Sequence, residues 1–336
     1  METDSGASSA ASKGVRMVHA IYPERDSLFR SIAVSSEVLK ANKKYFGVQC
    51  TQCGTEMKKL LKCAKCKSVW YCSKECQKKN WSTHKPTCRA DERSSGLYKL
   101  VRMFSVNPVL MGYLKCGIVF ECGLLGNPRI GFDTPFLARV EIAIEPSDPL
   151  NFGGLYVNDP TVEEKLEGML QVNAITPWPS PSMQARLTPK RLNTWREARA
   201  RYNAEGFAED PVGLVEFIGH RCTDDSTNSM TAELHIPKMT LLGAMTRAPF
   251  TFVSAITGIH KKPLSAASCL EFINSHIRAD KQNQLFLRTE MTEQDKEVIR
   301  AAGRNEDTFS VRILKEKMER EQLYAGFLQL TRPVVT

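Results

Sequence analysis

The sequence predicts an α+β fold in which a small cysteine-rich segment precedes a larger domain of mixed helices and strands. Two observations lead to this prediction. Seven of the 11 cysteines lie between Cys50 and Cys88, and the hydrophobic pattern beyond position 97 changes repeatedly between helical and strand-like spacing. The chain has 336 residues, of which 42% are hydrophobic and 25% charged, which is enough for two units and a sizeable core.

The first part of the chain is predicted to be disordered and then helical. Residues 1–23 contain a Ser/Ala/Gly-rich stretch, with no basic segment followed by an apolar one, so we expect no secretory leader. Residues 24–49 carry spaced apolar side chains that predict a helix, with Asp26 as a candidate N-cap and Gly47 near its end. We therefore expect an intracellular protein, in the nucleus or cytoplasm, where cysteines bind metal more often than they form disulfides.

The larger unit, residues 97–336, is predicted to be an α+β domain. No apolar run reaches the length needed to cross a bilayer, so we expect no membrane span. The expected helices cover 97–125 with a break at Asn107–Pro108, then 189–207, 264–277, 292–302 and 309–328. The expected strands cover 136–144, 151–157, and the pair 212–218 and 230–236, with loops at 91–96 and 176–181.

The cysteine-rich segment has the spacing of paired metal ligands. Structural zinc takes four Cys or His ligands in a tetrahedron, and a Cys-x2-Cys turn supplies two neighbouring ligands. Two ligands at i and i+4 also lie together, on one face of a helix. Eight ligands in four pairs therefore predict two bound Zn²⁺ ions. The pairs are Cys50 with Cys53, Cys63 with Cys66, Cys72 with Cys76, and His84 with Cys88.

Both predicted sites are complete, so they are structural rather than catalytic. The alternative of core cysteines or a disulfide framework does not explain four regularly spaced pairs. Nine lysines and one arginine against two glutamates give a charge of +8 between positions 50 and 90. Seven thiolates and two Zn²⁺ ions reduce that charge to about +5. The free energy of zinc binding, on the order of 10 kcal/mol per site, contributes directly to folding. It therefore allows a segment with few large apolar residues to fold.

The segment from Cys50 to Cys88, with WYCSKECQ at 70–77 followed by Trp81, resembles a MYND-type zinc finger. Spacing alone leaves open whether successive pairs share an ion or alternate pairs do. The resemblance implies the second, cross-braced arrangement. The remainder of the chain resembles only loosely the fungal MYND-finger proteins of unassigned role. In the implied arrangement Cys50, Cys53, Cys72 and Cys76 bind the first zinc, and Cys63, Cys66, His84 and Cys88 bind the second.

Gln77 and Trp81 are the candidate peptide-binding residues. They stand four positions apart on a predicted helix and would project from one face. The resemblance implies that the matching Gln and Trp contact a proline-containing segment of a protein partner, in which a ring packs on proline and an amide reads the backbone. The alternative is that Trp81 only covers the small core of the finger.

Nucleic acid is a second candidate partner, because lysine clusters attract phosphate in a salt-dependent manner. We disfavour it, since the finger has no recognition helix of the usual kind and its corrected charge is modest. The expected function is therefore that of a zinc-binding adaptor for a protein partner.

An uncharacterised enzyme in residues 126–336, with the finger as its recruitment module, is the remaining alternative. A SET methyltransferase is disfavoured, because about 49 residues precede the finger and no Asn-His-Ser-Cys-like segment or post-SET cysteine cluster follows it. Cys116 and Cys122 lie in an apolar helical pattern and are predicted to be core residues. No spacing rule selects one further polar cluster as a metal or nucleophile site, and we interpret it as the end of a strand. It consists of Glu216, His220, Cys222, Asp224 and Asp225.

Overall fold

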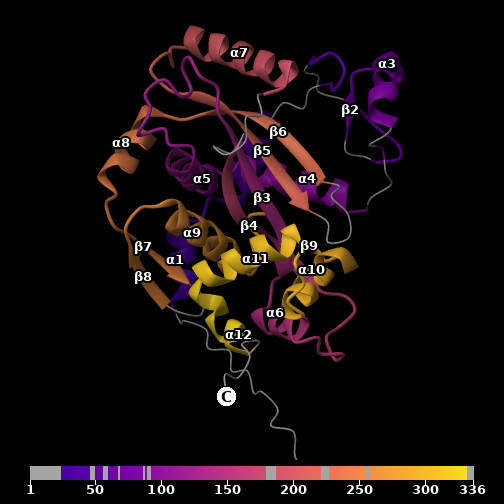
Figure 1. Ribbon diagram of the computed structural model, residues 1–336, viewed down its shortest axis with the longest axis vertical. Coiled ribbons are helices and arrows are strands. Elements are labelled where there is room, and N and C mark those ends of the chain that lie inside the picture. The colour runs from indigo at the N-terminus through magenta and orange to yellow at the C-terminus, as the bar shows by residue number, and fades with distance from the viewer. Residues whose placement is uncertain are drawn as a thin grey trace, which may run out of the picture.

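The computed structural model describes residues 24–45, 50–55, 60–66, 69–85, 88, 92–178, 187–220, 227–254 and 258–330. The predicted disordered segment 1–23 lies outside these residues. A small finger lies beside a larger body built on a five-stranded sheet (Figure 1). Helices and strands are mixed throughout, so the predicted α+β class is confirmed.

The central sheet has the strand order β6-β5-β3-β4-β9. β3 runs parallel to β5, and the other neighbours are antiparallel. β3 and β5 are almost entirely buried, which explains their high content of Val, Ile, Leu and Phe. The strands are β3 (Leu137–Pro146), β4 (Glu167–Trp178), β5 (Val212–His220), β6 (Thr227–His235) and β9 (Arg288–Glu290).

Helices α4 (Glu92–Ser105) and α5 (Pro108–Glu121) cover one face of the sheet. Phe104 packs edge-on against Phe217 of β5, with ring centroids 5.9 Å apart. At Gly117 an added Cβ would lie 2.8 Å from the Ile175 side chain, so the close approach of α5 to β4 requires glycine there.

Three other helices cover the opposite face: α7 (Pro189–Ala204), α10 (Glu293–Gly303) and α11 (Phe309–Arg320). Trp195 of α7 packs on Leu137 and Leu214, and its indole nitrogen donates to the Val212 carbonyl oxygen at 2.7 Å. α10 and α11 pack over the other end of β3 and β4.

Helix α9 (Ala266–Ala279) lies along the edge of β4 beyond its short pairing with β9. The Asn274 side chain accepts from the Val172 amide at 2.7 Å and donates to the Val172 carbonyl at 2.8 Å. One side-chain amide therefore replaces the neighbouring strand and satisfies backbone groups that burial would otherwise leave unpaired.

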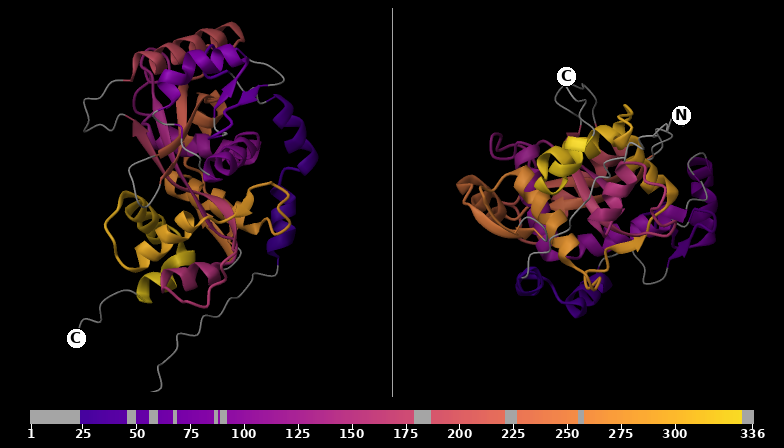
Figure 2. Two further views of the ribbon diagram at one scale, coloured as in Figure 1. Left: turned by 90° about the vertical axis from the view of Figure 1, so that its right-hand side faces the viewer. Right: turned by 90° about the horizontal axis from the view of Figure 1, so that it is seen from below.

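The N-terminal helices pack on the outside of this body (Figure 2). Phe29 of α1 (Arg25–Ile32) lies 4.9 Å from the ring of His276 on α9. The Asn42 side chain of α2 (Ser36–Tyr45) donates to the Val106 carbonyl at 3.1 Å. The remaining elements of the larger body are α6 (Pro149–Tyr156), α8 (Lys238–Thr246), the hairpin β7 (Phe250–Ser254) and β8 (Gly258–Lys262), the 3-10 turn η2 (Gln322–Tyr324) and α12 (Ala325–Leu330).

Several predicted elements have the expected type and differ from the observed bounds by a few residues. The break at Asn107 is also observed, because its side chain accepts from the Val109 and Leu110 amides and caps α5. The confirmed elements are the helices at 189–207, 264–277 and 292–302 and the strands at 136–144, 212–218 and 230–236.

Other predicted elements are wrong. The strand expected at 151–157 is helix α6, because the Asp148 side chain caps the Leu150 amide and Pro149 occupies the first turn. The single helix over 24–49 is two helices separated at Ala33, which is extended. The helix over 309–328 ends at Arg320, and Glu321 is extended before η2.

Two expected loops also differ. Helix α4 begins at Glu92, so the linker at 91–96 is largely helical. β4 continues to Trp178, inside the expected proline-rich loop. The sequence missed most of β4 because it is buried on both faces and lacks alternation.

No single helix in the described ranges is long and apolar enough to cross a membrane. The bent pair Leu97–Ser105 and Pro108–Glu121, which meet at 88°, passes the same test together by length and composition only.

Candidate metal centres and peptide-binding surface

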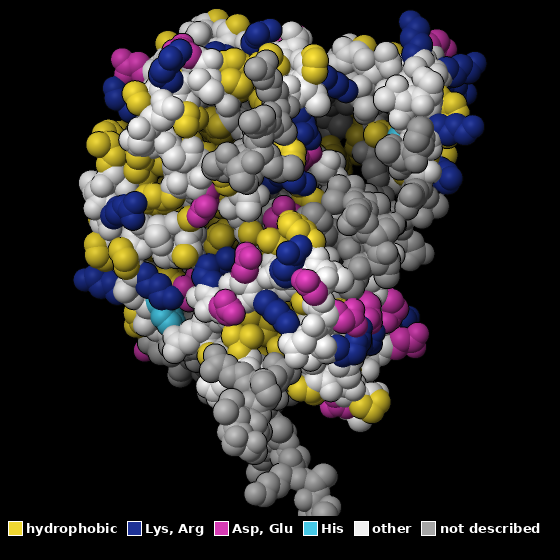
Figure 3. Space-filling view, viewed as in Figure 1, with side chains coloured by type: hydrophobic (Ala, Val, Ile, Leu, Met, Phe, Trp, Pro, Cys, Tyr) yellow, Lys and Arg dark blue, Asp and Glu magenta, His cyan; other side chains and the backbone are white. Residues whose placement is uncertain are grey.

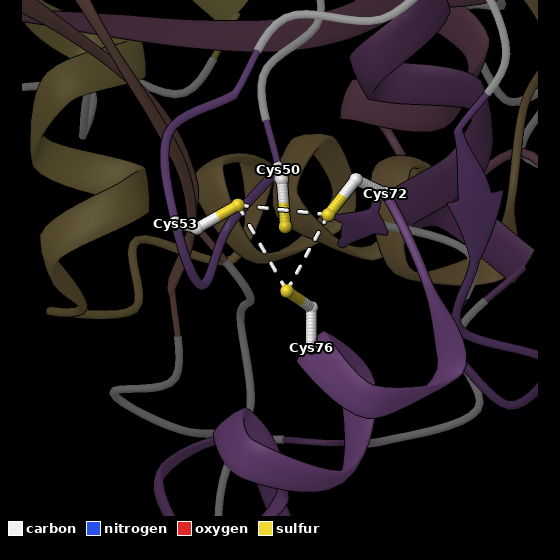
Figure 4. Close-up of side chains that lie close together, drawn as sticks. All are labelled: Cys50, Cys53, Cys72 and Cys76. Atoms are coloured by element: carbon white, nitrogen blue, oxygen red, sulfur yellow. Dashed lines mark hydrogen bonds between the residues drawn. The ribbon is translucent and has the colours of Figure 1, made fainter.

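Four cysteines converge in the first half of the finger. Cys50 and Cys53 come from the turn at its start, Cys72 follows strand β2 (Trp70–Tyr71), and Cys76 lies on α3 (Lys74–His84). Figure 4 shows their sulfur atoms pointing toward one another. The Cys53 sulfur lies 3.5 Å from that of Cys72 and 3.8 Å from that of Cys76.

A second cluster contains three cysteines and a histidine, all buried. The Cys63 and Cys88 sulfur atoms are 3.6 Å apart, and the Cys66 sulfur lies 3.4 Å from Nε2 of His84. Cys63 and Cys66 lie on the loop after β1 (Leu61–Lys62), while His84 ends α3. Alternate ligand pairs therefore share a site, as the cross-braced arrangement requires.

The dimensions of both clusters fit zinc. A tetrahedral ion with Zn–S bonds of about 2.3 Å has neighbouring sulfurs about 3.8 Å apart. The observed sulfur separations of 3.4 to 3.8 Å are close to that edge and far longer than a disulfide bond. The two clusters therefore fit two Zn²⁺ ions, with four protein ligands each and no position left for a substrate.

Hydrogen bonds shift the pKa values of two ligands of the first cluster in opposite directions. The Thr55 hydroxyl lies 3.2 Å from the Cys53 sulfur, and hydrogen bonds from Thr55 lower the pKa of Cys53 to about 6. Hydrogen bonds with Cys76 and Cys53 raise the pKa of Cys72 to about 12. Without metal the thiols of this cluster share protons, and a divalent ion replaces those protons when it binds.

Local structure fixes the ligands on α3. The Ser73 hydroxyl caps the helix by accepting from the Cys76 amide, which sets where the helix begins. Beneath the helix, Tyr71 is fully buried and its hydroxyl donates to the Asn80 side chain at 2.9 Å. Tyr71 is the one large side chain in the interior cluster that the described finger residues form.

The two candidate peptide-binding residues lie on one side of α3, next to the zinc ligand His84. Gln77 is half-buried, and Trp81 is 41% exposed. The Trp81 ring also packs edge-on against the zinc ligand His84, with centroids 5.9 Å apart. One side of the ring thus covers the second metal cluster while another remains open, so the two sequence-based interpretations of Trp81 are compatible.

Trp70 joins the finger to the larger body, a role that sequence reasoning missed. Its ring lies 5.6 Å from the ring of Tyr98 on α4, and the Lys62 ammonium lies 4.3 Å from its centroid. The signal available was a large aromatic residue in a finger whose small interior already contains Tyr71.

A buried polar network in the larger domain was also missed. The Lys317 ammonium donates to Glu145 at 2.6 Å and to Gln171 at 3.2 Å, and the Tyr324 hydroxyl donates to Glu145 at 2.6 Å. Arg278 donates to Gln171 and to Tyr324, each at 2.9 Å. The available signal was Glu145 near the end of a largely apolar strand, where a buried charge needs a partner.

The polar cluster proposed from sequence is only partly described. Glu216 is buried, pairs with Arg191, and has an oxygen 3.8 Å from Nε of Arg139. Its carboxylate is therefore already engaged by two cations. The side chain of His220 and residues Cys222, Asp224 and Asp225 lie outside the described part of the chain.

The two cysteines predicted to be core residues are both shielded from solvent, to different extents. Cys122 is buried as expected, and Cys116 is half-buried.

A cavity of about 30 Å³ lies between the sheet and helices α10 and α11. This volume holds about one or two water molecules. It gives no support to the enzyme alternative. Its polar lining consists of Glu141, Glu145, Asn173, Asp295 and Ser310.

Comparison with known proteins separates the two parts of the chain. Residues 50–88 match the family described as MYND finger. Residues 94–324, more than half of the chain, match the family described as Domain of unknown function (DUF8205). No solved structure matches the chain.

Three curated relatives match short segments of the chain. N-lysine methyltransferase SMYD2-B of Danio rerio is 43% identical over 84 residues, which are 25% of this chain and 18% of the relative. Histone-lysine N-methyltransferase SMYD3 of Homo sapiens is 34% identical over 89 residues, 26% of this chain and 20% of the relative. Egl nine homolog 1 of Homo sapiens is 43% identical over 47 residues, 14% of this chain and 11% of the relative. The chain thus spans about a fifth or less of the length of these relatives.

Proposed function

The chain belongs to the DUF8205 family and carries a zinc-binding MYND finger, a protein-interaction module, ahead of that domain, and we propose that the finger binds a proline-containing segment of a protein partner across Gln77 and Trp81. The observation that carries this proposal is the position of Trp81. Its ring is 41% exposed on the outer face of α3, while the inner face of the same helix is fixed by metal ligands.

The geometry suits an extended peptide. A flat, partly exposed ring offers an apolar surface to a proline ring, and proline-containing segments lose little conformational entropy on binding. The Gln77 amide, one helical turn away, can donate to and accept from a peptide backbone. Because Trp81 packs on His84, the second zinc site also holds the ring in position.

We assign a binding role to the chain and no catalytic step. The relatives that carry methyltransferase names match over segments of fewer than 90 residues. Both metal clusters are filled by four protein ligands.

The proposal is tested with the full chain and an array of short proline-containing peptides, each paired with a version in which alanine replaces proline. Trp81→Ala and Gln77→Ala should each lower affinity at least tenfold, because each removes a contact group and leaves all eight metal ligands in place. Ser82→Ala, exposed on another side of α3, is the matched control. Zinc content should stay near two ions per chain in all variants. Unchanged binding by both Trp81→Ala and Gln77→Ala would show that this surface is not the site.

A further inference from the structure

The face of α3 that carries Gln77 and Trp81 also carries three lysines. With 3.6 residues per turn, positions 74, 77, 78, 81 and 85 fall on one side of a helix. Lys74, Lys78 and Lys85 are all exposed, and Lys85 continues the helical backbone one residue beyond α3. The aromatic and amide groups are therefore bordered by cations along the whole helix.

Among the described finger residues, one acidic side chain, Glu75, stands near the three exposed lysines of this face. Glu56 and Glu75 are the two acidic residues between positions 50 and 88. Glu75 lies on α3 more than a quarter-turn from the line of Gln77 and Trp81, between Lys78 at i+3 and Lys79 at i+4, so it offsets part of the charge of these lysines. A hydrogen bond from Ser73, its own backbone, and the charges of Lys78 and Lys74 lower the pKa of Glu75. Figure 3 shows Lys and Arg side chains gathered over α3, on the outer side of the finger.

We propose that the partner segment is acidic, with carboxylate groups on both sides of the proline that packs on Trp81. This inference rests on the proposed function, because it uses the same face of α3. Charge complementarity between exposed lysines and carboxylates speeds association and selects among proline-containing segments.

The distance between the outermost lysines of α3 sets the length of the partner segment. Lys74 and Lys85 are separated by 11 helical positions, which is about 16 Å at 1.5 Å per residue. An extended peptide covers that distance in about five residues. Its proline lies against Trp81, and one acidic residue lies near each end.

A protein partner fits these groups better than nucleic acid does. The cations follow a single short helix rather than a groove, and an amide and an indole stand among them. Nucleic-acid surfaces neutralise a longer row of phosphates, and their affinity falls steeply with salt for that reason. An oligonucleotide is nevertheless included in the test as a competing ligand.

The test uses the full, zinc-loaded chain and the same peptide array made in two versions, with aspartate or with asparagine on both sides of proline. We expect the aspartate versions to bind wild type at least tenfold more tightly. The triple variant Lys74→Gln, Lys78→Gln and Lys85→Gln should abolish that difference while retaining two zinc ions. A second triple variant has the same change in net charge at exposed lysines off this face, and it should preserve the difference. It combines Lys65→Gln, Lys79→Gln and Lys99→Gln.

The outcomes separate this inference from the proposed function. Equal binding of the two peptide versions, with loss of both in Trp81→Ala, would overturn the acidic preference and leave the proline site standing. Loss of the preference in both triple variants would also overturn it, since net charge alone would then explain it. Binding of neither version would overturn both proposals. Tighter binding of a single-stranded oligonucleotide, dependent on the same three lysines, would overturn the peptide assignment in favour of nucleic acid.

Discussion

The finger and the larger domain are stabilised by different means. The interior cluster of the described finger residues consists of Cys50, Cys63, Cys66, Cys88 and Tyr71, so four of its five members are metal ligands. The larger domain has an extensive apolar core on both faces of its sheet, together with a fully buried ionic network. The contrast shows why one region depends on an ion and the other on packing.

Metal removal should produce the largest difference in stability between the finger and the larger domain. Stripping both ions leaves seven thiols and one imidazole around a single tyrosine, so the finger should unfold. The loss is on the order of 10 kcal/mol per site at neutral pH. The larger domain contains neither cluster and should keep its cooperative thermal transition.

Hydrogen exchange with and without a chelator measures both parts at once. Amides of β2 and α3 should lose protection, whereas those of β3 and β5 should retain it. Any loss of protection that passes from the finger to the larger domain should begin at the contact between Trp70 and Tyr98. Equal loss of protection in both regions would show that the finger is part of the same cooperative unit.

Lys317 should be the most sensitive single position of the buried network. Lys317→Met leaves Glu145 buried with only the Tyr324 hydroxyl at 2.6 Å and Arg278 at 4.0 Å. Removing one partner of a buried ion pair lowers the free energy of unfolding by about 3–5 kcal/mol. Denaturant unfolding of the full chain provides the measurement.

The double variant Glu145→Gln with Lys317→Met is the matched control. It removes both charges, so it should lose less stability than Lys317→Met alone. If the double variant were the less stable of the two, the penalty would come from lost packing rather than from an unpaired carboxylate.

His276 should give the domain a pH dependence of its own. Burial lowers the pKa of His276 from 6.5 to about 4. None of the described residues forms a hydrogen bond with its Nε2, and the ring lies between Phe29 and Phe272 with the buried Arg25 beside the same cavity. The unfolded chain therefore binds a proton more readily than the folded chain as pH falls below 6.5.

The resulting loss of stability is about 2 kcal/mol at pH 5 and approaches about 3 kcal/mol below pH 4, while little is lost at pH 7. His276→Phe keeps an aromatic ring and removes the titrating group. The difference in unfolding free energy between wild type and His276→Phe should therefore change by about 2 kcal/mol between pH 7 and pH 5. Acid release of zinc is common to both proteins and cancels in that difference. A constant difference across this range would contradict the pKa shift.

The sequence predicted the finger more completely than the domain, for a physical reason. The ligands of the finger lie within 39 residues, and cysteine and histidine at these spacings are typical zinc ligands. Both sets of ligands could therefore be identified without coordinates. The pairing of the clusters came from the family resemblance, because spacing permits either order.

In the domain, the decisive contacts join residues far apart in the chain. Lys317 meets Glu145 across 172 positions, and Asn274 meets Val172 across 102. Local patterns located β3, β5 and α7, whose periodicity or capping is evident. They failed at β4, which lacks alternation, and at α6, where apolar residues suggested a strand despite Asp148–Pro149.

Helix caps offer the smallest and most evenly matched comparison of the two regions. Ser73 caps α3 in the finger by accepting from the Cys76 amide at 3.3 Å, and Asn107 caps α5 in the domain by accepting from the Val109 amide at 3.0 Å. Loss of such a cap lowers stability by about 1 kcal/mol. Ser73→Ala should therefore weaken zinc binding by about fivefold and leave the thermal transition of the domain unchanged. Asn107→Ala should lower that transition and leave zinc affinity unchanged. Competition with a chromophoric chelator and calorimetry measure the two effects. If either substitution changed both quantities, the two regions would be energetically coupled through α4, which lies between them in the chain.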